Sequence, residues 1–109
     1  MSTPLCLVLT TVATDEDARC LARAMVEQRL AACAQINPID SVYRWNGALH
    51  CELEWRVLFK TTEAARPALQ AALRAAHPYE LPAIVALPMT AEEDFAQWME
   101  TQIGEGSAE

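Results

Sequence analysis

The chain has 109 residues, of which 52% are hydrophobic and 21% charged, a composition typical of one globular domain. Eight basic and 15 acidic residues give a formal net charge of −7, and Lys60 is the only lysine. Because phosphate groups are bound by clustered cationic side chains, we expect no nucleic-acid partner and no anionic membrane surface as a partner.

We expect a cytoplasmic protein. The first residues carry no basic segment, and the apolar run after Pro4 is only about five residues long, too short for a secretion signal. No stretch approaches the ~18 apolar residues of a membrane span. Four cysteines lack any Cys-x-x-Cys spacing, which argues against structural zinc and, in the cytosol, against disulfides. We expect each to be a buried small hydrophobe: Cys6, Cys20, Cys33 and Cys51.

The first predicted elements are a strand and a helix. Residues 5–12 are apolar and rich in β-branched side chains, which favours a strand. Thr14 is expected to cap a helix that runs to about Leu30, since three acidic residues follow it and anions stabilise a helix N-terminus. Apolar residues recur at helical spacing on one predicted face: Ala18, Leu21, Ala22 and Met25.

Residues 31–62 are predicted to form a long hairpin. Asn46-Gly47 is its turn, because both residues tolerate the positive φ of a type I′ turn. This register places Tyr43 opposite His50, Ile36 opposite Val57, and Cys33 opposite Lys60. Asn37-Pro38 is expected to interrupt the ladder, since proline cannot donate a hydrogen bond.

The remaining chain is predicted to form a helix, a strand and a last helix. The first of these starts at Thr62, holds Pro67 in its first turn and stops before Pro78. Residues 81–87 are expected to form a central strand buried on both faces. Thr90 and Glu93 have the spacing of a capping box, and the helix that they open is expected to turn three residues inward: Phe95, Trp98 and Met99.

The order of these elements predicts an α+β fold. A βαββαβ sandwich of the ferredoxin-like type, with a C-terminal helix added, fits one domain over 1–109 in which 1–4 and 104–109 are flexible. Helices cover one sheet face, while the other face mixes apolar Leu58 and Cys33 with charged residues. That face and the long hairpin with its open edges predict a closed oligomer of this chain.

Several motifs, in order over about residues 5–103, resemble the CutA family. They comprise Leu30-Ala-Ala-Cys33, Tyr43-x-Trp45 with Gly47, Lys60-Thr61-Thr62, His77-Pro-Tyr-Glu80-x-Pro82, and Leu87-Pro88 followed by a helix containing Trp98. The resemblance implies a homotrimer whose sheets face the threefold axis, and a link to tolerance of copper and other divalent cations. The chain departs from copper-binding bacterial members at two positions, where Thr10 and Ala76 replace a cysteine and a histidine.

The candidate site residues lie in the predicted hairpin and before the last strand. His77 follows a helix C-terminus and is interpreted either as a ligand or acid/base in a cleft, or as a cap that binds free carbonyls. Tyr79 and Glu80 follow it, and Glu80 is expected to pair with Lys60, either in the site or as a structural salt bridge at a subunit contact.

Two more candidates come from the hairpin. Cys33 opposite Lys60 is interpreted either as a thiol with a lowered pKa, which would favour reactivity and metal binding, or as a packed thiol. Trp45, with Tyr43, is expected to pack on a neighbouring protomer, the alternative being ring stacking on a ligand.

The sequence therefore predicts a non-enzymatic homotrimer associated with divalent-metal-ion tolerance. It requires no cofactor, and copper or another divalent cation is expected to bind weakly at His77 and Cys33. The alternative is a small-ligand signalling trimer with clefts between subunits, similar to nitrogen-regulatory proteins. No Gly-rich phosphate loop and no nucleophile elbow is present.

Overall fold

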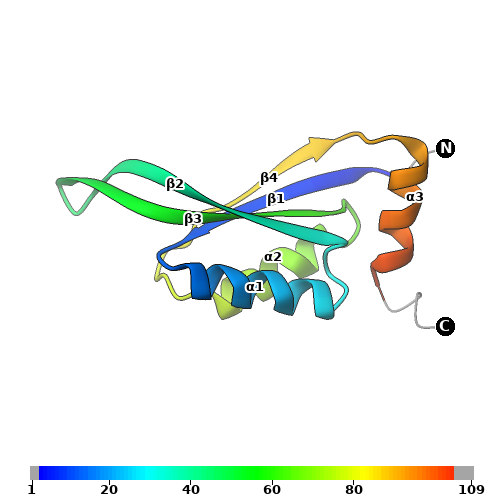
Figure 1. The fold of residues 1–109 in the computed structure, drawn as a ribbon, viewed down its shortest axis with the longest axis horizontal. Coiled ribbons are helices and arrows are strands. Elements are labelled where there is room, and N and C mark those ends of the chain that lie inside the picture. Colours follow the sequence, from blue (N-terminus) through cyan, green and yellow to red (C-terminus); the bar gives the residue numbers. More distant parts are fainter. Residues whose placement is uncertain (1–2, 105–109) are drawn as a thin grey trace.

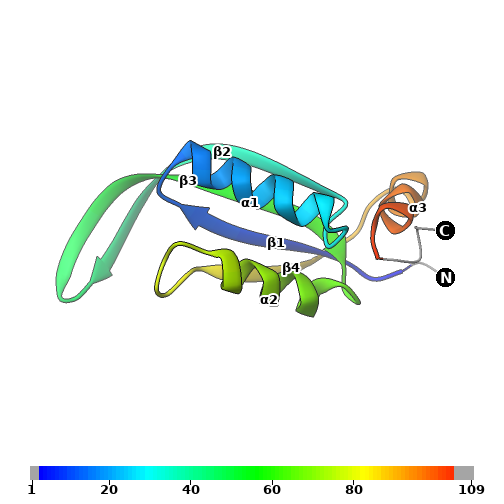
Figure 2. The same cartoon turned by 90° about the horizontal axis from the view of Figure 1, so that it is seen from below.

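The computed structural model describes residues 3–104, which form one four-stranded antiparallel sheet and three helices. The elements are β1 (Leu5–Val12), α1 (Asp15–Glu27), β2 (Cys33–Trp45), β3 (Ala48–Thr62), α2 (Arg66–Ala76), β4 (Ile84–Met89) and α3 (Glu93–Gln102). The strand order is β2-β3-β1-β4, and α1 and α2 lie side by side on one face of the sheet (Figure 1 and Figure 2). This arrangement confirms the predicted ferredoxin-like fold.

β1 is an inner strand, and its bounds agree with the prediction. It pairs with β3 on one side and β4 on the other. Because side chains alternate along a strand, every second residue points toward the helices, and these four are each at most 1% exposed: Cys6, Val8, Thr10 and Val12. They join a core whose largest members are Phe59, Met25, Leu69 and Leu73.

α1 begins as predicted and ends earlier. The Thr14 hydroxyl accepts a hydrogen bond from the Asp17 N–H at 3.0 Å, the bond of an N-cap. The predicted apolar face is buried against the sheet. The helix ends at Glu27 rather than near Leu30, since Arg29 has a φ of 62°, which a right-handed helix cannot contain.

The hairpin has the predicted turn and register. Asn46 and Gly47 have φ angles of 51° and 79°, as a type I′ turn requires. The pairing then runs without interruption from Trp45 opposite Ala48 to Cys33 opposite Lys60.

The predicted interruption at Asn37-Pro38 is wrong. Pro38 lies opposite Trp55 within the continuous ladder. Counting from the turn, the alternation of antiparallel pairs puts Pro38 at a position whose backbone groups point away from β3. Since β2 is an edge strand, the absent N–H of Pro38 costs no ladder hydrogen bond.

α2 starts later than predicted and ends as predicted. Thr62 is the last residue of β3, and its hydroxyl accepts a hydrogen bond from the Ala65 N–H at 3.1 Å. The helix begins at Arg66 with Pro67 in its first turn, and it ends at Ala76, directly before His77-Pro78, because a residue before proline is disfavoured in the helical region.

The prediction of a central strand over 81–87 is wrong. β4 begins at Ile84 and lies at the edge of the sheet, beyond β1. Ile84 and Ala86 pack on the core, whereas Val85 and Leu87 are 48% and 46% exposed. The continuous apolar run therefore belongs to an edge strand. One face of this strand packs on the core, and the other is part of the sheet face that α1 and α2 do not cover.

α3 closes the end of the sheet where β1 begins (Figure 1), and it differs from the prediction in two ways. Its N-cap is Glu92, without a side-chain hydrogen bond, so the predicted capping box of Thr90 and Glu93 is wrong. Met99 is buried as expected, but Phe95 and Trp98 remain more than one-third exposed. The inward face of this short helix is narrow and is formed by Ala96 and Met99, which pack on Leu5.

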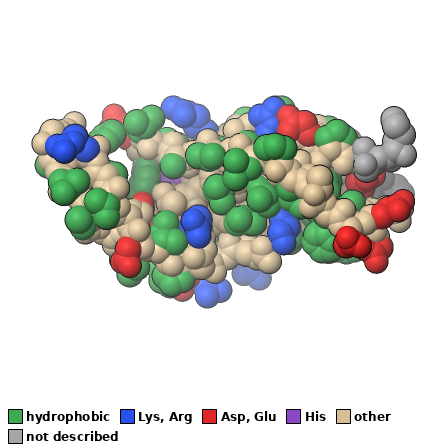
Figure 3. Space-filling view, turned by 90° about the horizontal axis from the view of Figure 1, so that it is seen from above, with side chains coloured by type: hydrophobic (Ala, Val, Ile, Leu, Met, Phe, Trp, Pro, Cys, Tyr) green, Lys and Arg blue, Asp and Glu red, His purple; other side chains and the backbone are tan. Residues whose placement is uncertain are grey.

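The sheet face opposite the helices is apolar in its middle (Figure 3). The alternation in the register places there the half-buried Leu7 and Leu9 of β1, Leu58 of β3, and the exposed Val85 and Leu87 of β4. The hairpin extends past the helix layer (Figure 1), and its apolar residues Val42, Leu49 and Leu53 are all at least 59% exposed.

The cysteines and the chain ends qualify two further predictions. All four thiols are free, but Cys20 and Cys51 are exposed, so the prediction that each is buried is wrong for these two.

The chain ends were predicted to be flexible over residues 1–4 and 104–109. Of these, residues 1, 2 and 105–109 lie outside the described residues. Pro4 accepts a hydrogen bond from the Glu63 N–H at 3.0 Å, and Gly104 donates one to the Arg29 carbonyl at 2.9 Å.

The N-cap of α1 gives a first test of this fold. Replacing Thr14 by Ala removes the acceptor for the Asp17 N–H and should lower the free energy of unfolding by about 1 kcal/mol. Thr14→Ser keeps a hydroxyl acceptor and should change it by a few tenths at most. Urea denaturation of both variants measures the difference, and equal losses would show that the cap hydrogen bond does not stabilise α1.

Candidate ligand-binding site

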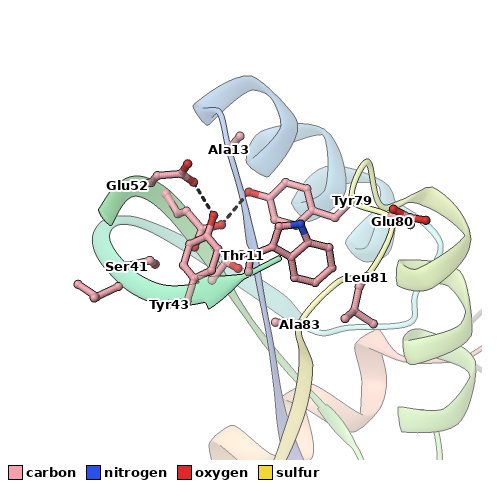
Figure 4. Close-up of a pocket in the computed structure, with 12 residues that line it drawn as sticks. Thr11, Ala13, Ser41, Tyr43, Glu52, Tyr79, Glu80, Leu81 and Ala83 are labelled. Atoms are coloured by element: carbon pink, nitrogen blue, oxygen red, sulfur yellow. Dashed lines mark hydrogen bonds between the residues drawn. The ribbon is translucent and has the colours of Figure 1, made fainter. Parts of the chain in front are cut away.

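A cleft of about 730 Å³ lies where the hairpin leaves the sheet (Figure 4). β1 ends at Val12, opposite Trp55, while both hairpin strands continue beyond this point. The cleft is bounded by the hairpin, by the end of β1 and by the loop before β4, and it is lined by Thr11, Ala13, Ser41, Val42, Tyr43, Trp45, Glu52, Glu54, Tyr79, Glu80, Leu81 and Ala83. Its volume is that of a small-molecule site.

Two tyrosine–glutamate hydrogen bonds organise the polar part of this cleft. The Tyr79 hydroxyl donates to Glu54 Oε2 at 2.7 Å, and the Tyr43 hydroxyl donates to Glu52 Oε1 at 2.6 Å. Glu54 is only 7% exposed. Burial and the bond to Glu54 raise the pKa of Tyr79 far above its ordinary value, and the bond to Glu52 raises the pKa of Tyr43 to about 12. Both hydroxyls therefore stay protonated and act as donors at neutral pH.

His77 lies behind the cleft and fastens the loop to β1. The Thr10 hydroxyl donates to the Ala83 carbonyl at 2.6 Å, so its oxygen accepts from His77 Nε2–H at 2.9 Å, which also faces the Thr11 carbonyl at 3.0 Å. His77 Nδ1 accepts from the Tyr79 N–H at 3.1 Å. Both ring nitrogens are thus engaged, and the bonds run to β1 and to the loop rather than to the end of α2.

The surroundings of His77 favour its neutral form. The residue is 9% exposed. Burial lowers the pKa of His77 below its ordinary value of 6.5, and this effect outweighs the Thr11 carbonyl and the charges of Asp17 and Glu54, which act in the opposite direction.

Cys33 and Lys60 are opposite each other as predicted, on the sheet face away from the helices. Burial raises the pKa of the Cys33 thiol and outweighs the opposing charge of Lys60, so the interpretation of Cys33 as a thiol with a lowered pKa is wrong. The Lys60 ammonium lies 5.6 Å from the centre of the Phe95 ring, a distance at which a cation and an aromatic face attract.

The six predicted site residues fall into two groups. Trp45, Tyr79 and Glu80 line the cleft, with His77 directly behind them. Cys33 and Lys60 lie along the sheet toward α3. Because His77 bonds to Thr10 on the helix side of the sheet, it is on the opposite face from Cys33. Within one chain, Glu80 and Lys60 form no ion pair among the described residues.

Sequence reasoning missed Glu52 and Glu54 as site residues. The predicted register already placed them on one face of the hairpin, on the same side as Tyr43. The register of the hairpin gives no information on Tyr79, which reaches Glu54 from a loop 25 residues away along the chain. Without that approach an acidic residue on a strand is more simply interpreted as solvated.

The described residues contain no group of three or more His, Cys, Asp or Glu side chains arranged to hold a metal ion. In the same part of the chain, no helix is long and apolar enough to cross a membrane.

Comparisons with known proteins identify relatives that share one family name. The family model for the CutA1 divalent ion tolerance protein matches residues 6–102. The divalent-cation tolerance protein CutA of Thermus thermophilus is 43% identical over 100 residues, which cover 90% of this chain and 97% of the relative. The Escherichia coli protein of the same name is 34% identical, with 89% and 88% covered.

Solved structures agree with these sequence matches. CutA from Synechococcus elongatus superposes with a TM-score of 0.90 at 42% identity, covering 95% of each chain. A second structure of CutA from this organism, complexed with a Bis-Tris molecule, gives 0.87 at 40% identity and covers 94% of this chain and 98% of that one. CutA from Archaeoglobus fulgidus, described as periplasmic, gives 0.88 at 27% identity and covers 92% and 99%.

The buried, neutral His77 can be tested directly by its titration. In His50→Gln the remaining imidazole is that of His77, and we expect its NMR signal to titrate with a midpoint below 6.5, because burial disfavours the charged form. Because the pKa of His77 is lower in the folded state than in the unfolded state, burial of the neutral imidazole contributes to the stability of the fold. This contribution is present above the unfolded-state pKa and is lost as the pH falls through the folded-state pKa. A midpoint at or above 6.5 would contradict this environment.

Proposed function

Since the chain belongs to the CutA1 divalent ion tolerance family, we propose that it is a non-enzymatic protein of divalent-metal-ion tolerance that acts as a homotrimer. The observation that carries the tolerance function is the family match over residues 6–102, together with relatives of that name at 43% and 34% identity over nearly the whole chain.

The exposed apolar surfaces support self-assembly. Val85 and Leu87 on the open sheet face, and Leu49 and Leu53 on the projecting hairpin, are large side chains that a second copy would cover. β2 and β4 form the two edges of the sheet, and unpaired edges favour contacts between copies. The resemblance to the family supplies the copy number of three.

A copper site at His77 and Cys33 is proposed as weak. The two residues lie on opposite faces of the sheet, so one ion would bind to one of them in any one chain. An ion at His77 would have to displace the Tyr79 N–H from Nδ1. Thr10 and Ala76 supply no soft or imidazole ligand, which further limits affinity. No cofactor is proposed as a requirement for folding or action.

The absence of catalysis and a cytoplasmic location are also part of the proposal. A raised thiol pKa makes Cys33 a poor nucleophile at neutral pH, and both nitrogens of His77 are committed to structural bonds. Four free cysteines fit a reducing compartment, although the Archaeoglobus relative is described as periplasmic.

A small-ligand-binding trimer is the second candidate. The cleft between the hairpin and the loop before β4 favours it, and the Synechococcus relative binds a Bis-Tris molecule in its structure. Ligand binding and ion tolerance are compatible roles of one assembly.

The assembly is tested by mass and by a charge placed on the open face. Light scattering should give three times the chain mass of 12.0 kDa. Leu87→Glu places a carboxylate on the open sheet face and should shift the mass toward one chain at micromolar concentration, because an unpaired charge is costly to bury. The matched control Ala71→Glu, on the exposed side of α2, should keep the mass of the unmodified protein. A monomeric unmodified protein, or a Leu87→Glu protein of unchanged mass, would contradict the proposed packing.

Copper binding is tested by calorimetric titration of Cu²⁺ under an inert atmosphere. We expect a dissociation constant in the micromolar range or weaker and a loss of about tenfold in affinity in His77→Ala, since an imidazole is the preferred copper ligand here. Cys33→Ala reports on the second position, and His50→Gln is the matched control for loss of a histidine. Equal affinities in the unmodified protein, His77→Ala and Cys33→Ala would place the ion elsewhere.

A further inference from the structure

The cleft beside the hairpin has an unusual chemical balance. Three glutamates and no lysine, arginine or histidine are among its lining residues. Three aromatic rings, those of Tyr43, Trp45 and Tyr79, share this lining. An anionic ligand would meet carboxylates without a compensating cation, so the balance disfavours phosphates and carboxylic acids.

The central carboxylate forms no ion pair with a cationic side chain in the part of the chain that the structure describes. Glu54 is 7% exposed and accepts from Tyr79, yet among residues 3–104 none of the ion pairs includes it. Buried charges are usually paired. A ligand that brings a positive charge into the cleft would supply the missing partner.

The rings are placed to receive such a ligand. Figure 4 shows Tyr43 and Tyr79 reaching toward each other from the hairpin and the loop, with Glu52 beside Tyr43 and with Leu81 and Ala83 forming apolar wall below. His50 stacks on Tyr43 at 5.3 Å between ring centres, with 10° between the planes, so the His50 ring packs on one face of the Tyr43 ring. Electron-rich aromatic faces next to carboxylates attract ammonium groups.

From this arrangement we propose that the cleft between the hairpin and residues 79–83 binds a small organic cation, a protonated or quaternary amine, between the three aromatic rings and Glu54. A metal ion is disfavoured there, because the described residues offer no set of three metal ligands and the lining is largely apolar and aromatic. The inference does not depend on the proposed ion-tolerance function, and it names a ligand class for the small-ligand cleft of the second candidate function.

The proposal is tested with choline as the probe and its neutral isostere 3,3-dimethyl-1-butanol as the control ligand. Both have the same shape, and only choline carries a charge. Calorimetric titration of the full chain should show choline binding at least about tenfold more tightly than the alcohol, because the charge meets aromatic faces and a carboxylate.

Protein variants then locate the binding. Glu54→Gln keeps an acceptor for Tyr79 and removes the charge, and it should weaken choline binding by about tenfold or more. Glu27→Gln, an exposed acid on α1, should leave it unchanged. Tyr43→Leu, on the exposed hairpin, removes a ring without touching Glu54 and should also weaken binding, so it replaces Glu54→Gln if that chain fails to fold.

Three results would overturn the proposal. These are no choline binding at millimolar concentration, equal affinity for choline and the alcohol, and equal effects of the cleft variants and Glu27→Gln. The second result would describe an apolar cleft without charge selectivity, and the third a general attraction to an acidic protein. Measuring the mass of each variant in parallel separates loss of the cleft from loss of the assembly.

Discussion

The length difference between β1 and the hairpin is the constraint on which the functional surface depends. β1 ends at Val12 opposite Trp55, while β2 and β3 remain paired with each other as far as Trp45 and Ala48. Beyond Val12 no further strand of the described chain pairs with β3 on the side of β1. The side of the hairpin that faces Tyr79 is therefore left uncovered and forms one wall of the cleft. A two-residue type I′ turn keeps this extension rigidly paired, since the backbone twist of such a turn matches that of the strands.

The Thr10 side chain links β1 to the loop before β4. It lies in the core, 1% exposed, and joins β1 to His77 and to Ala83 at once. His77 in turn accepts from the Tyr79 N–H, and Tyr79 reaches Glu54. This chain of bonds holds the loop before β4 against the end of β1. Both bonds of the Thr10 hydroxyl therefore serve to position the loop that lines the cleft.

The errors of the sequence predictions have particular physical causes. An apolar run such as that of β4 does not distinguish a strand buried between helices from an edge strand with one face exposed. The Thr90 and Glu93 spacing fits a capping box, but β4 ends at Met89, residues 90–92 form neither strand nor helix, and the helix begins three residues after Thr90, at Glu93. For Cys33, the register was correct and the electrostatic inference was not, because the burial that opposes ionisation depends on the packing around the thiol.

The sequence by itself determined the order of elements, the ferredoxin-like topology, the turn at Asn46-Gly47 and the pairing of Cys33 with Lys60, because these follow from local spacing and from the alternation of strand residues. It also placed Glu52, Glu54 and Tyr43 on one face. Only the tertiary structure decided that Tyr79 meets Glu54 and that His77 is held between Thr10 and Tyr79. These contacts join segments 25 and 67 residues apart, and such separations leave no periodicity in the sequence; they arise when the core packs α2 against the sheet and carries the following loop to the end of β1.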